Sequence, residues 1–299
     1  MGGSSPPSIK DLSSIPQFDD NITITSSGDP DLVGLNIPIV TSFRPPKVFH
    51  NRPYSTRKNI ARDNKAVNTL SLPKISLFNA RSLFPKIKQL ALDMKERNTD
   101  VSFITEIWES VTSKKHMSKI EELLELEGVA YISTPRSTRV KTKTKTRTKR
   151  GGGAAIAVML DKFSISKLNI QIPAKLEIVW GLLRPKTSDG FFKDIIVCCF
   201  YSPPHSRKNQ ILLDHIALTL QHLLTDHENA GVIICCDRND LPIDAVLSAD
   251  PTLRQLVHVP THGPNILDVI YTNLGSYYND AVTIPSLSPD AECNGVPST

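Results

Sequence analysis

The sequence of 299 residues lacks the patterns of several specialised protein classes. No apolar stretch approaches the roughly 20 residues that span a bilayer. The first residues, MGGSSPPSIKDLSS, lack the charged-then-apolar pattern of a secretory signal. No internal repeat has the spacing of a solenoid. We therefore expect a soluble, intracellular protein.

The five cysteines do not form a metal or redox motif. They occur as two adjacent pairs, Cys198 with Cys199 and Cys235 with Cys236, and as Cys293. Neither pair has the Cys-x-x-Cys spacing of a zinc or redox site. Both pairs lie in apolar runs, so we expect buried free thiols in a reducing compartment.

Positive charge is concentrated in one segment. The run 139–150, RVKTKTKTRTKR, contains seven basic and no acidic residues, whereas the rest of the chain has 28 Lys and Arg against 30 Asp and Glu, a balance of −2. We interpret 136–150 as a basic Lys/Thr loop between two strands. Lys141, Lys143, Lys145 and Arg147 are candidate contacts to a nucleic-acid backbone. A solvated, disordered surface loop is the simpler alternative.

The chain divides into two parts. Residues 1–71 are rich in Pro, Ser, Asn and Asp and show no sustained periodicity, which predicts a mostly disordered leader. Residues 72–299 alternate between strand-like and helix-like patterns, with some strands directly connected, which favours an α/β fold with mixed sheets. The expected helices span 83–97, 117–126 and 209–227. The expected strands span 74–79, 100–106, 129–133, 151–160, 176–183, 194–201, 231–236, 267–274 and 281–287.

Polar side chains that could bind ligands or take part in catalysis lie at the ends of several of these strands. Ligands in α/β sheets gather at the carboxyl ends of strands, and residues two apart in an extended chain share a face. Asp and Asn are also ordinary turn residues, so each position alone is uninformative. The set comprises Asn79, Glu106, Tyr201, Asp237 with Asn239, and Asp268, which begins a strand just after Thr261 and His262.

This set suits metal-assisted phosphodiester hydrolysis. Magnesium takes oxygen ligands and keeps several waters, so one or two carboxylates suffice to hold it. Glu106 would be the metal ligand, supported by Asn79. Asp237 would orient or deprotonate the attacking water, with the amide of Asn239 on a phosphate oxygen. Tyr201 would donate a hydrogen bond to the phosphate.

Six motifs in this order, NARSL, DVSFITEIW, RGGGAAIAV, VCCFYSPP, CCDRND and LDVIYTN, carry a family resemblance. From about Lys74 to Thr299 the chain resembles the endonuclease/exonuclease/phosphatase superfamily. It looks most like the apurinic-endonuclease-type domain of non-LTR (LINE-type) retrotransposons. The resemblance implies a four-layer, DNase I-like α/β sandwich of two mixed sheets flanked by helices. It also implies magnesium or manganese, nicking of DNA to prime reverse transcription, nuclear access, and a reverse-transcriptase domain further along the polyprotein.

Residue by residue, the resemblance supports the same set of positions. Asn79 matches the family's first-strand Asn, Glu106 its metal ligand, Tyr201 its phosphate-contacting Tyr, and Asp237 and Asn239 its Asp-x-Asn motif. Thr261 resembles a Thr that often precedes the next strand, which we take as a substrate-binding residue. Asp268 resembles the Asp that orients a catalytic His.

The family's terminal Ser-Asp-His triplet has no full counterpart in this sequence. The chain ends AECNGVPST, so Ser298 stands for the Ser, Thr299 occupies the place of the Asp, and no His follows. We therefore expect a C-terminally incomplete domain with impaired activity and an unpaired edge where the last strand belongs.

Two further features leave alternatives open. The glycines 151–153 are consistent with a phosphate contact or, preferably, with a strand entry that needs close backbone approach. Trp108 follows the Glu106 strand, and core packing is favoured over stacking on a base. The alternative functions are an inactive retroelement remnant that at most binds nucleic acid, and a phosphoinositide or small phosphomonoester phosphatase.

Overall fold

The computed structural model describes residues 39–41, 72–109, 114–136, 139–141, 146–148, 151–187 and 192–284. The predicted leader, residues 1–71, lies outside this part of the chain apart from Ile39–Thr41. Residues 285–299, including the terminal Ser298 and Thr299, also lie outside it. Among the described residues, no helix is both long and apolar enough to cross a membrane.

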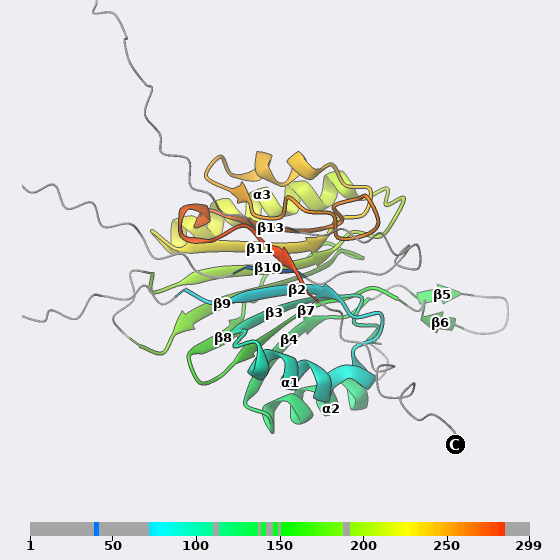
Figure 1. The fold of residues 1–299 in the computed structure, drawn as a ribbon. Coiled ribbons are helices and arrows are strands. Elements are labelled where there is room, and N and C mark those ends of the chain that lie inside the picture. The colour runs from blue at the N-terminus through cyan, green and yellow to red at the C-terminus, as the bar shows by residue number, and fades with distance from the viewer. Residues whose placement is uncertain are drawn as a thin grey trace, which may run out of the picture. The chain divides into compact units, whose positions relative to one another are not determined.

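Two mixed sheets of six strands each lie face to face in this part of the chain (Figure 1). The first sheet has the order β14-β1-β2-β3-β7-β4, with β2 parallel to β3 and its other pairs antiparallel. Its strands are β1 (Ile39–Thr41), β2 (Ile75–Asn79), β3 (Val101–Thr105), β4 (Val129–Thr134), β7 (Ala154–Met159) and β14 (Val282–Thr283).

The second sheet has the order β12-β13-β11-β10-β9-β8. Only β10 and β11 are parallel in it. Its strands are β8 (Phe163–Lys167), β9 (Glu177–Pro185), β10 (Ile195–Tyr201), β11 (Gly231–Asp237), β12 (Arg254–Gln255) and β13 (Asp268–Thr272).

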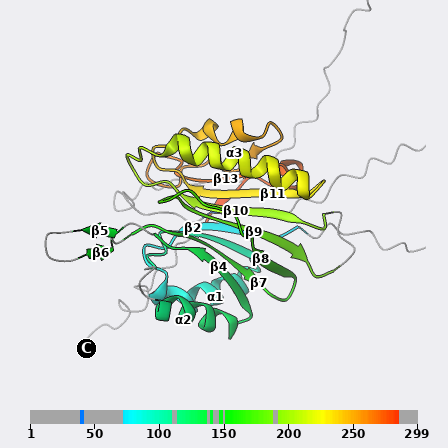
Figure 2. The same ribbon diagram turned by 180° about the vertical axis from the view of Figure 1, so that it is seen from behind.

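Helices cover the outer face of each sheet, which completes the four-layer α/β sandwich that the sequence predicted. Figures 1 and 2 show α1 (Ile87–Glu96) and α2 (Lys114–Glu125) on the first sheet, and α3 (Asn209–Asp226) on the second. Helix α1 buries Ile87, Leu90, Ala91 and Met94, which recur at helical spacing on one face.

Three apolar clusters hold the layers together. One fills the space between the two sheets, a second lies between the second sheet and α3, and a third lies between the first sheet and the helices α1 and α2. Cys199 and Cys235 belong to the first cluster, whereas Cys198 and Cys236 belong to the second. All four are buried free thiols, as predicted, because alternate residues of a strand face opposite sides of its sheet.

The helix boundaries differ from prediction by a few residues. Helix α1 begins at Ile87 rather than near residue 83, because Pro85 lies in a 3-10 turn, Phe84–Lys86, that precedes it. Proline is tolerated only in the first turn of a helix. Strands β8 and β12 were not predicted, and β12 has only two residues.

Part of the basic run forms a hairpin instead of the predicted loop. The strands β5 (Arg139–Lys141) and β6 (Thr146–Thr148) pair antiparallel, with Arg139 opposite Thr148. Threonine at alternate positions favours extended backbone, which accounts for the pairing. Figures 1 and 2 show the hairpin projecting from the sheets.

The strand β1 lies within the segment for which no ordered structure was predicted. It pairs with β2 on one side and with β14 on the other, and Ile39 is fully buried. Residues from the N-terminal segment therefore cover the edge of β2.

Candidate active site where the two sheets meet

Four polar residues form a row across one end of the second sheet. In the strand register, Tyr201 lies opposite Glu177 on one side and opposite Asp237 on the other, and Asp237 lies opposite Asp268. Tyr201 and Asp237 end the parallel strands β10 and β11, whereas Glu177 and Asp268 begin the antiparallel neighbours β9 and β13. Carboxyl ends of two strands and amino ends of two others thus meet at one edge.

The first sheet contributes its residues from the ends of β2 and β3. Asn79 is the last residue of β2 and lies in register with Thr105, so Glu106 follows one position further along β3. The two strands are parallel, which places both polar residues at the same edge.

Three hydrogen bonds join the predicted residues into two groups, which are neighbours because Tyr201 lies opposite Asp237 in the register of β10 and β11. Asn79 Nδ2 donates to Asp237 Oδ2 across the two sheets at 2.9 Å, and Asn239 Nδ2 donates to Asp237 Oδ1 at 2.9 Å. The hydroxyl of Tyr201 donates to Glu106 Oε1 at 2.6 Å, also across the sheets. The structure therefore brings together the five residues that were read from the strand ends.

The amide of Asn239 contacts groups of the chain itself, and its contact with a phosphate oxygen stays a prediction. Its Nδ2 donates to Asp237 and also to the backbone oxygen of Ser202 at 2.9 Å. Asn79 is held similarly, because its Oδ1 accepts from the backbone N–H of Arg81 at 3.1 Å. Both amides therefore orient the Asp237 carboxylate.

Burial and like charge dominate the electrostatics of this row. Burial, with the nearby charge of Glu106, raises the pKa of Asp237 to about 7, although the hydrogen bond from Asn79 opposes the shift. Burial and the charge of Asp237 raise the pKa of Asp268 well above its usual range. Burial and the contact with Glu106 also raise the pKa of Tyr201, so its phenol remains a hydrogen-bond donor at neutral pH.

Several site residues have left-handed backbone conformations. Glu106 has φ 52°, Trp108 φ 56° and Asn239 φ 44°, and Arg81 and Ser82 beside Asn79 have φ 42° and 88°. Such conformations cost about 1–3 kcal/mol each for non-glycine residues and cluster at functional sites. The strain supports a functional assignment for this edge of the sheets.

The oxygen donors of the site fit a hard divalent cation. Among the described residues, no group of three or more His, Cys, Asp and Glu side chains has a metal-binding arrangement. Magnesium needs only one or two carboxylates with water and substrate oxygens. Glu106 and Asp237 repel each other enough to contribute to the raised pKa of Asp237, and a cation between them would offset that repulsion.

Thr261 and Asp268 stabilise the entry into β13. The hydroxyl oxygen of Thr261 is fully buried and accepts from the backbone N–H groups of Leu267 and Asp268, each at 3.0 Å. Within the described part of the chain, Asp268 Oδ1 is buried and has no hydrogen-bond partner. An orphaned carboxylate oxygen of this kind calls for a partner that the described residues do not supply.

The candidate phosphate contacts of the basic run remain predictions. Lys141 and Arg147 lie in the hairpin strands β5 and β6, whose backbone alone is described, and Lys143 and Lys145 lie outside the described residues.

Three site residues were missed or misassigned from the sequence. Glu177 was read only as the start of a strand, and its ion-pair partner Arg136 was read as the start of a loop. Trp108 was expected in the core, but it is 43% exposed and its Nε1 donates to Glu106 Oε2 at 2.8 Å. The signal for Glu177 was available, since it is a polar residue at the first position of an apolar strand.

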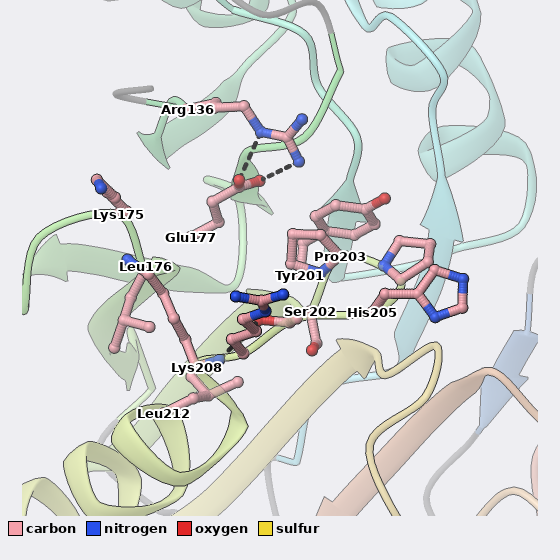
Figure 3. Close-up of a pocket in the computed structure, with 13 residues that line it drawn as sticks. Arg136, Lys175, Leu176, Glu177, Tyr201, Ser202, Pro203, His205, Lys208 and Leu212 are labelled. Carbon is pink, nitrogen blue, oxygen red and sulfur yellow. Dashed lines mark hydrogen bonds and ion pairs between the residues drawn. The ribbon is translucent and has the colours of Figure 1, made fainter. Parts of the chain in front are cut away.

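Tyr201 also lines a cavity of about 280 Å³ (Figure 3). Four basic side chains and one acidic side chain line it: Arg136, Lys175, Arg207 and Lys208, with Glu177. Burial and the charge of Lys175 lower the pKa of Lys208. The excess of positive charge favours an anionic ligand next to the phenol.

The sequence matches no family model and no curated protein. Solved structures with partial similarity to this chain include the following three. The human Nocturnin catalytic domain with bound sulfate has a TM-score of 0.44 and 13% identity, covering 63% of this chain and 74% of that one. An endonuclease/exonuclease/phosphatase from Bacteroides vulgatus has a TM-score of 0.46 and 11% identity, with coverage of 67% and 86%. TDP2 of D. rerio, complexed with a single-strand DNA product, has a TM-score of 0.40 and 9% identity, with coverage of 64% and 77%.

These structural neighbours include an endonuclease/exonuclease/phosphatase protein. Because each of the three TM-scores is below 0.5, the interpretation of the site rests on its own geometry.

Proposed function

We propose that this chain is a metal-dependent phosphodiesterase, and that it is the DNA-nicking endonuclease domain of a non-LTR retrotransposon. The observation that carries the proposal is the pair of contacts between the sheets, Asn79 to Asp237 and Tyr201 to Glu106. They join a carboxylate with a raised pKa, a second carboxylate and a phenol donor at one edge. Those are the groups that phosphodiester hydrolysis requires.

Each residue has a distinct role in the proposed mechanism. Glu106, with Asn79, would hold magnesium or manganese, which supplies charge neutralisation at the phosphate when it is bound. Asp237 orients the attacking water and accepts its proton, and a pKa of about 7 suits a base that works near neutral pH. Tyr201, whose hydroxyl donates to Glu106 in this structure, would redirect that one hydrogen bond to a phosphate oxygen when Glu106 holds the cation.

The surroundings of these groups favour a polyanionic substrate. In the basic cavity beside Tyr201, Lys175, Arg207 and Lys208 would accommodate a phosphate next to the one being cleaved, whereas the charge of Arg136 is already paired with Glu177. The basic run, through Lys141, Lys143, Lys145 and Arg147, would add contacts to the DNA backbone. The family resemblance implies that Asp268, whose Oδ1 has no hydrogen-bond partner among the described residues, would orient a catalytic histidine.

Plasmid nicking in magnesium tests the proposal. Wild type should convert supercoiled plasmid to open circles, and Glu106→Ala and Asp237→Ala should each reduce the rate at least about 10²-fold. Glu127→Ala is the matched control, because Glu127 pairs with Lys95 on an exposed surface and should leave the rate unchanged. Equal cleavage by wild type and the site variants would identify a contaminating nuclease and refute the proposal.

A substrate panel separates the alternative functions. Release of phosphate from inositol phosphates or p-nitrophenyl phosphate, without nicking of DNA, would indicate a phosphomonoesterase. Salt-dependent DNA binding without any hydrolysis would indicate an inactive remnant. Either result contradicts the proposed endonuclease.

A further inference from the structure

A buried ion pair lies directly beside the candidate site. Arg136 Nε contacts Glu177 Oε1 at 2.5 Å, and the two side chains are only 8% and 4% exposed. Glu177 Oε2 also accepts from Arg136 at 3.3 Å and from the backbone N–H of Gly153 at 2.6 Å. Figure 3 shows the guanidinium and the carboxylate facing each other above Tyr201.

Stability does not explain this pair. The cost of removing two charges from water often exceeds the attraction that they gain, so an apolar pair of similar volume would stabilise the fold equally well or better. Burial, with a smaller contribution from the charge of Glu106, raises the pKa of Glu177, and the hydrogen bonds from Arg136 and Gly153 oppose that shift. A pair retained against this cost points to another role.

The glycines of the RGGG motif fit closely around the pair. A Cβ at Gly152 would lie 2.1 Å from Glu177 Oε2 and 2.4 Å from Arg136 Nε, and a Cβ at Gly153 would lie 2.7 Å from Ile107. Both residues also have positive φ, 78° and 88°. The sequence predicted that something approaches the backbone of these glycines closely. At Gly152 it is the carboxylate of Glu177 and the guanidinium of Arg136.

The Arg136–Glu177 ion pair lies directly against Tyr201. Glu177 lies directly opposite Tyr201 in the register of β9 and β10. The Arg136 guanidinium carbon lies 5.7 Å from the centre of the Tyr201 ring, within cation–π range. The hydroxyl of the same ring reaches Glu106. The ring is thus held between a cation on its face and a carboxylate at its hydroxyl.

We propose that Arg136 is a positioning residue: Glu177 and the glycine turn hold its guanidinium over the Tyr201 ring, and this contact fixes the phenol in place to donate to a phosphate oxygen. The inference rests on the proposed phosphodiesterase function. A cation over the ring also withdraws electron density from it, which makes the phenol a better hydrogen-bond donor.

Nicking kinetics test the inference through a double-mutant cycle. Arg136→Gln should lower kcat by about 3- to 30-fold, the range that corresponds to a cation–π contact, with KM nearly unchanged. Arg136→Lys should restore part of the loss, because it keeps a cation. In a Tyr201→Phe background, Arg136→Gln should have no further effect on kcat, since the hydroxyl that it positions is gone.

Two results would overturn the inference. Equal losses of kcat from Arg136→Gln with and without the Tyr201 hydroxyl would show that Arg136 acts independently of the phenol. A rise in KM at constant kcat would show that Arg136 binds substrate instead. Thermal unfolding of each variant shows whether a loss of kcat comes only from misfolding. If Arg136→Gln misfolds, Arg136→Lys is compared with wild type in its place.

A spectroscopic measurement separates this inference from the proposed function. With 3-fluorotyrosine at position 201 alone, the ¹⁹F resonance should move between wild type and Arg136→Lys, and further in Glu177→Gln, without metal or substrate. An unmoved resonance refutes the contact even if DNA is nicked. A moved resonance without any nicking confirms the contact and refutes the proposed function.

Discussion

The two ends of the second sheet differ in how deeply their charged side chains are buried. At the site end, Glu177, Asp237 and Asp268 are buried. At the other end, Asp194 contacts Arg184 at 2.7 Å and His227 at 2.7 Å. The side chain of Arg184 is 53% exposed, that of Asp194 23% and that of His227 20%. The far end balances its charges in contact with water, whereas the site end buries its charges: Glu177 is paired with Arg136, and the acids Asp237 and Asp268 lie side by side.

This difference separates stability from function along the same strands. Balanced, partly exposed ion pairs contribute little and cost little. Buried acids that repel each other lower the stability of the fold, so their presence indicates a chemical task. Substitutions at the far end should therefore have small effects on stability and none on activity, and those at the site end should have large effects of either sign on stability.

The largest stability effect is expected at the glycine turn. Gly152→Ala forces a Cβ onto the Arg136–Glu177 pair and should cost about 3–5 kcal/mol, the cost of breaking a buried pair. Gly128→Ala is the matched control, because its φ of 75° is close to the 78° of Gly152 but nothing lies within 4 Å of its Cβ. It should cost only about 1 kcal/mol. Urea unfolding measures both, and equal losses would show that backbone strain alone matters at Gly152.

A gain in stability is expected from Asp268→Asn. The pKa of Asp268 is raised in the folded protein from a usual value of 3.8, so folding favours its protonated form. Wild type therefore loses stability as the pH rises above 3.8 toward the folded pKa, and the Asn variant does not. At pH 8, in EDTA, we expect a gain of about 1–3 kcal/mol, the cost of a buried unsatisfied group.

The pH series provides the check on Asp268. Urea midpoints of wild type and variant should coincide below about pH 4, the usual titration range of Asp, and diverge as the pH rises. Asp226→Asn, on an exposed turn of α3, should change stability by less than about 0.5 kcal/mol at every pH. A constant gap between wild type and Asp268→Asn would show that the charge of Asp268 is not the cause.

The smallest effect is expected at the far end. Asp194→Ala removes contacts to Arg184 and His227 and should cost at most about 1 kcal/mol, as for other exposed pairs. Although burial acts to raise it, the pKa of Asp194 is lowered by these hydrogen bonds, so the loss should be present above pH 3.8 and vanish as the pH falls through the folded pKa. Nicking should remain at the wild-type rate. A loss of nicking activity would show that the far end of the sheet also affects catalysis.

The sequence predicted the long elements and the site residues at strand carboxyl ends. Apolar runs such as GVIICC mark strands buried on both faces, and the polar residues that follow them, Asp237 and Asn239, lie where the pattern places them. The same rule identified Asn79, Glu106 and Tyr201.

The rule missed Glu177 because it considers only polar residues at the carboxyl ends of strands. In a mixed sheet, an antiparallel neighbour begins at the edge where the parallel strands end, so its first residue joins the site. Asp268 occupies the equivalent position on β13 and was included because it begins a strand just after Thr261 and His262. A search of both ends of every strand would have found Glu177.

Other differences arise from contacts that are distant in sequence. Trp108 looks like a core residue by type, but its hydrogen bond to Glu106 holds it at the surface. The strands β1 and β12 have three and two residues, too few to show a periodic pattern. Their pairing is decided by the sheet edges that they meet.

The position of β1 has a practical consequence for expression of the domain. Ile39–Thr41 lies between β2 and β14, so a clone that begins at Leu72 would delete an interior strand of the first sheet. The outermost strand, Val282–Thr283, would then have no neighbour to pair with, and β2 would present an open edge prone to self-association. Recombinant protein intended for the experiments above should therefore start well before Ile39.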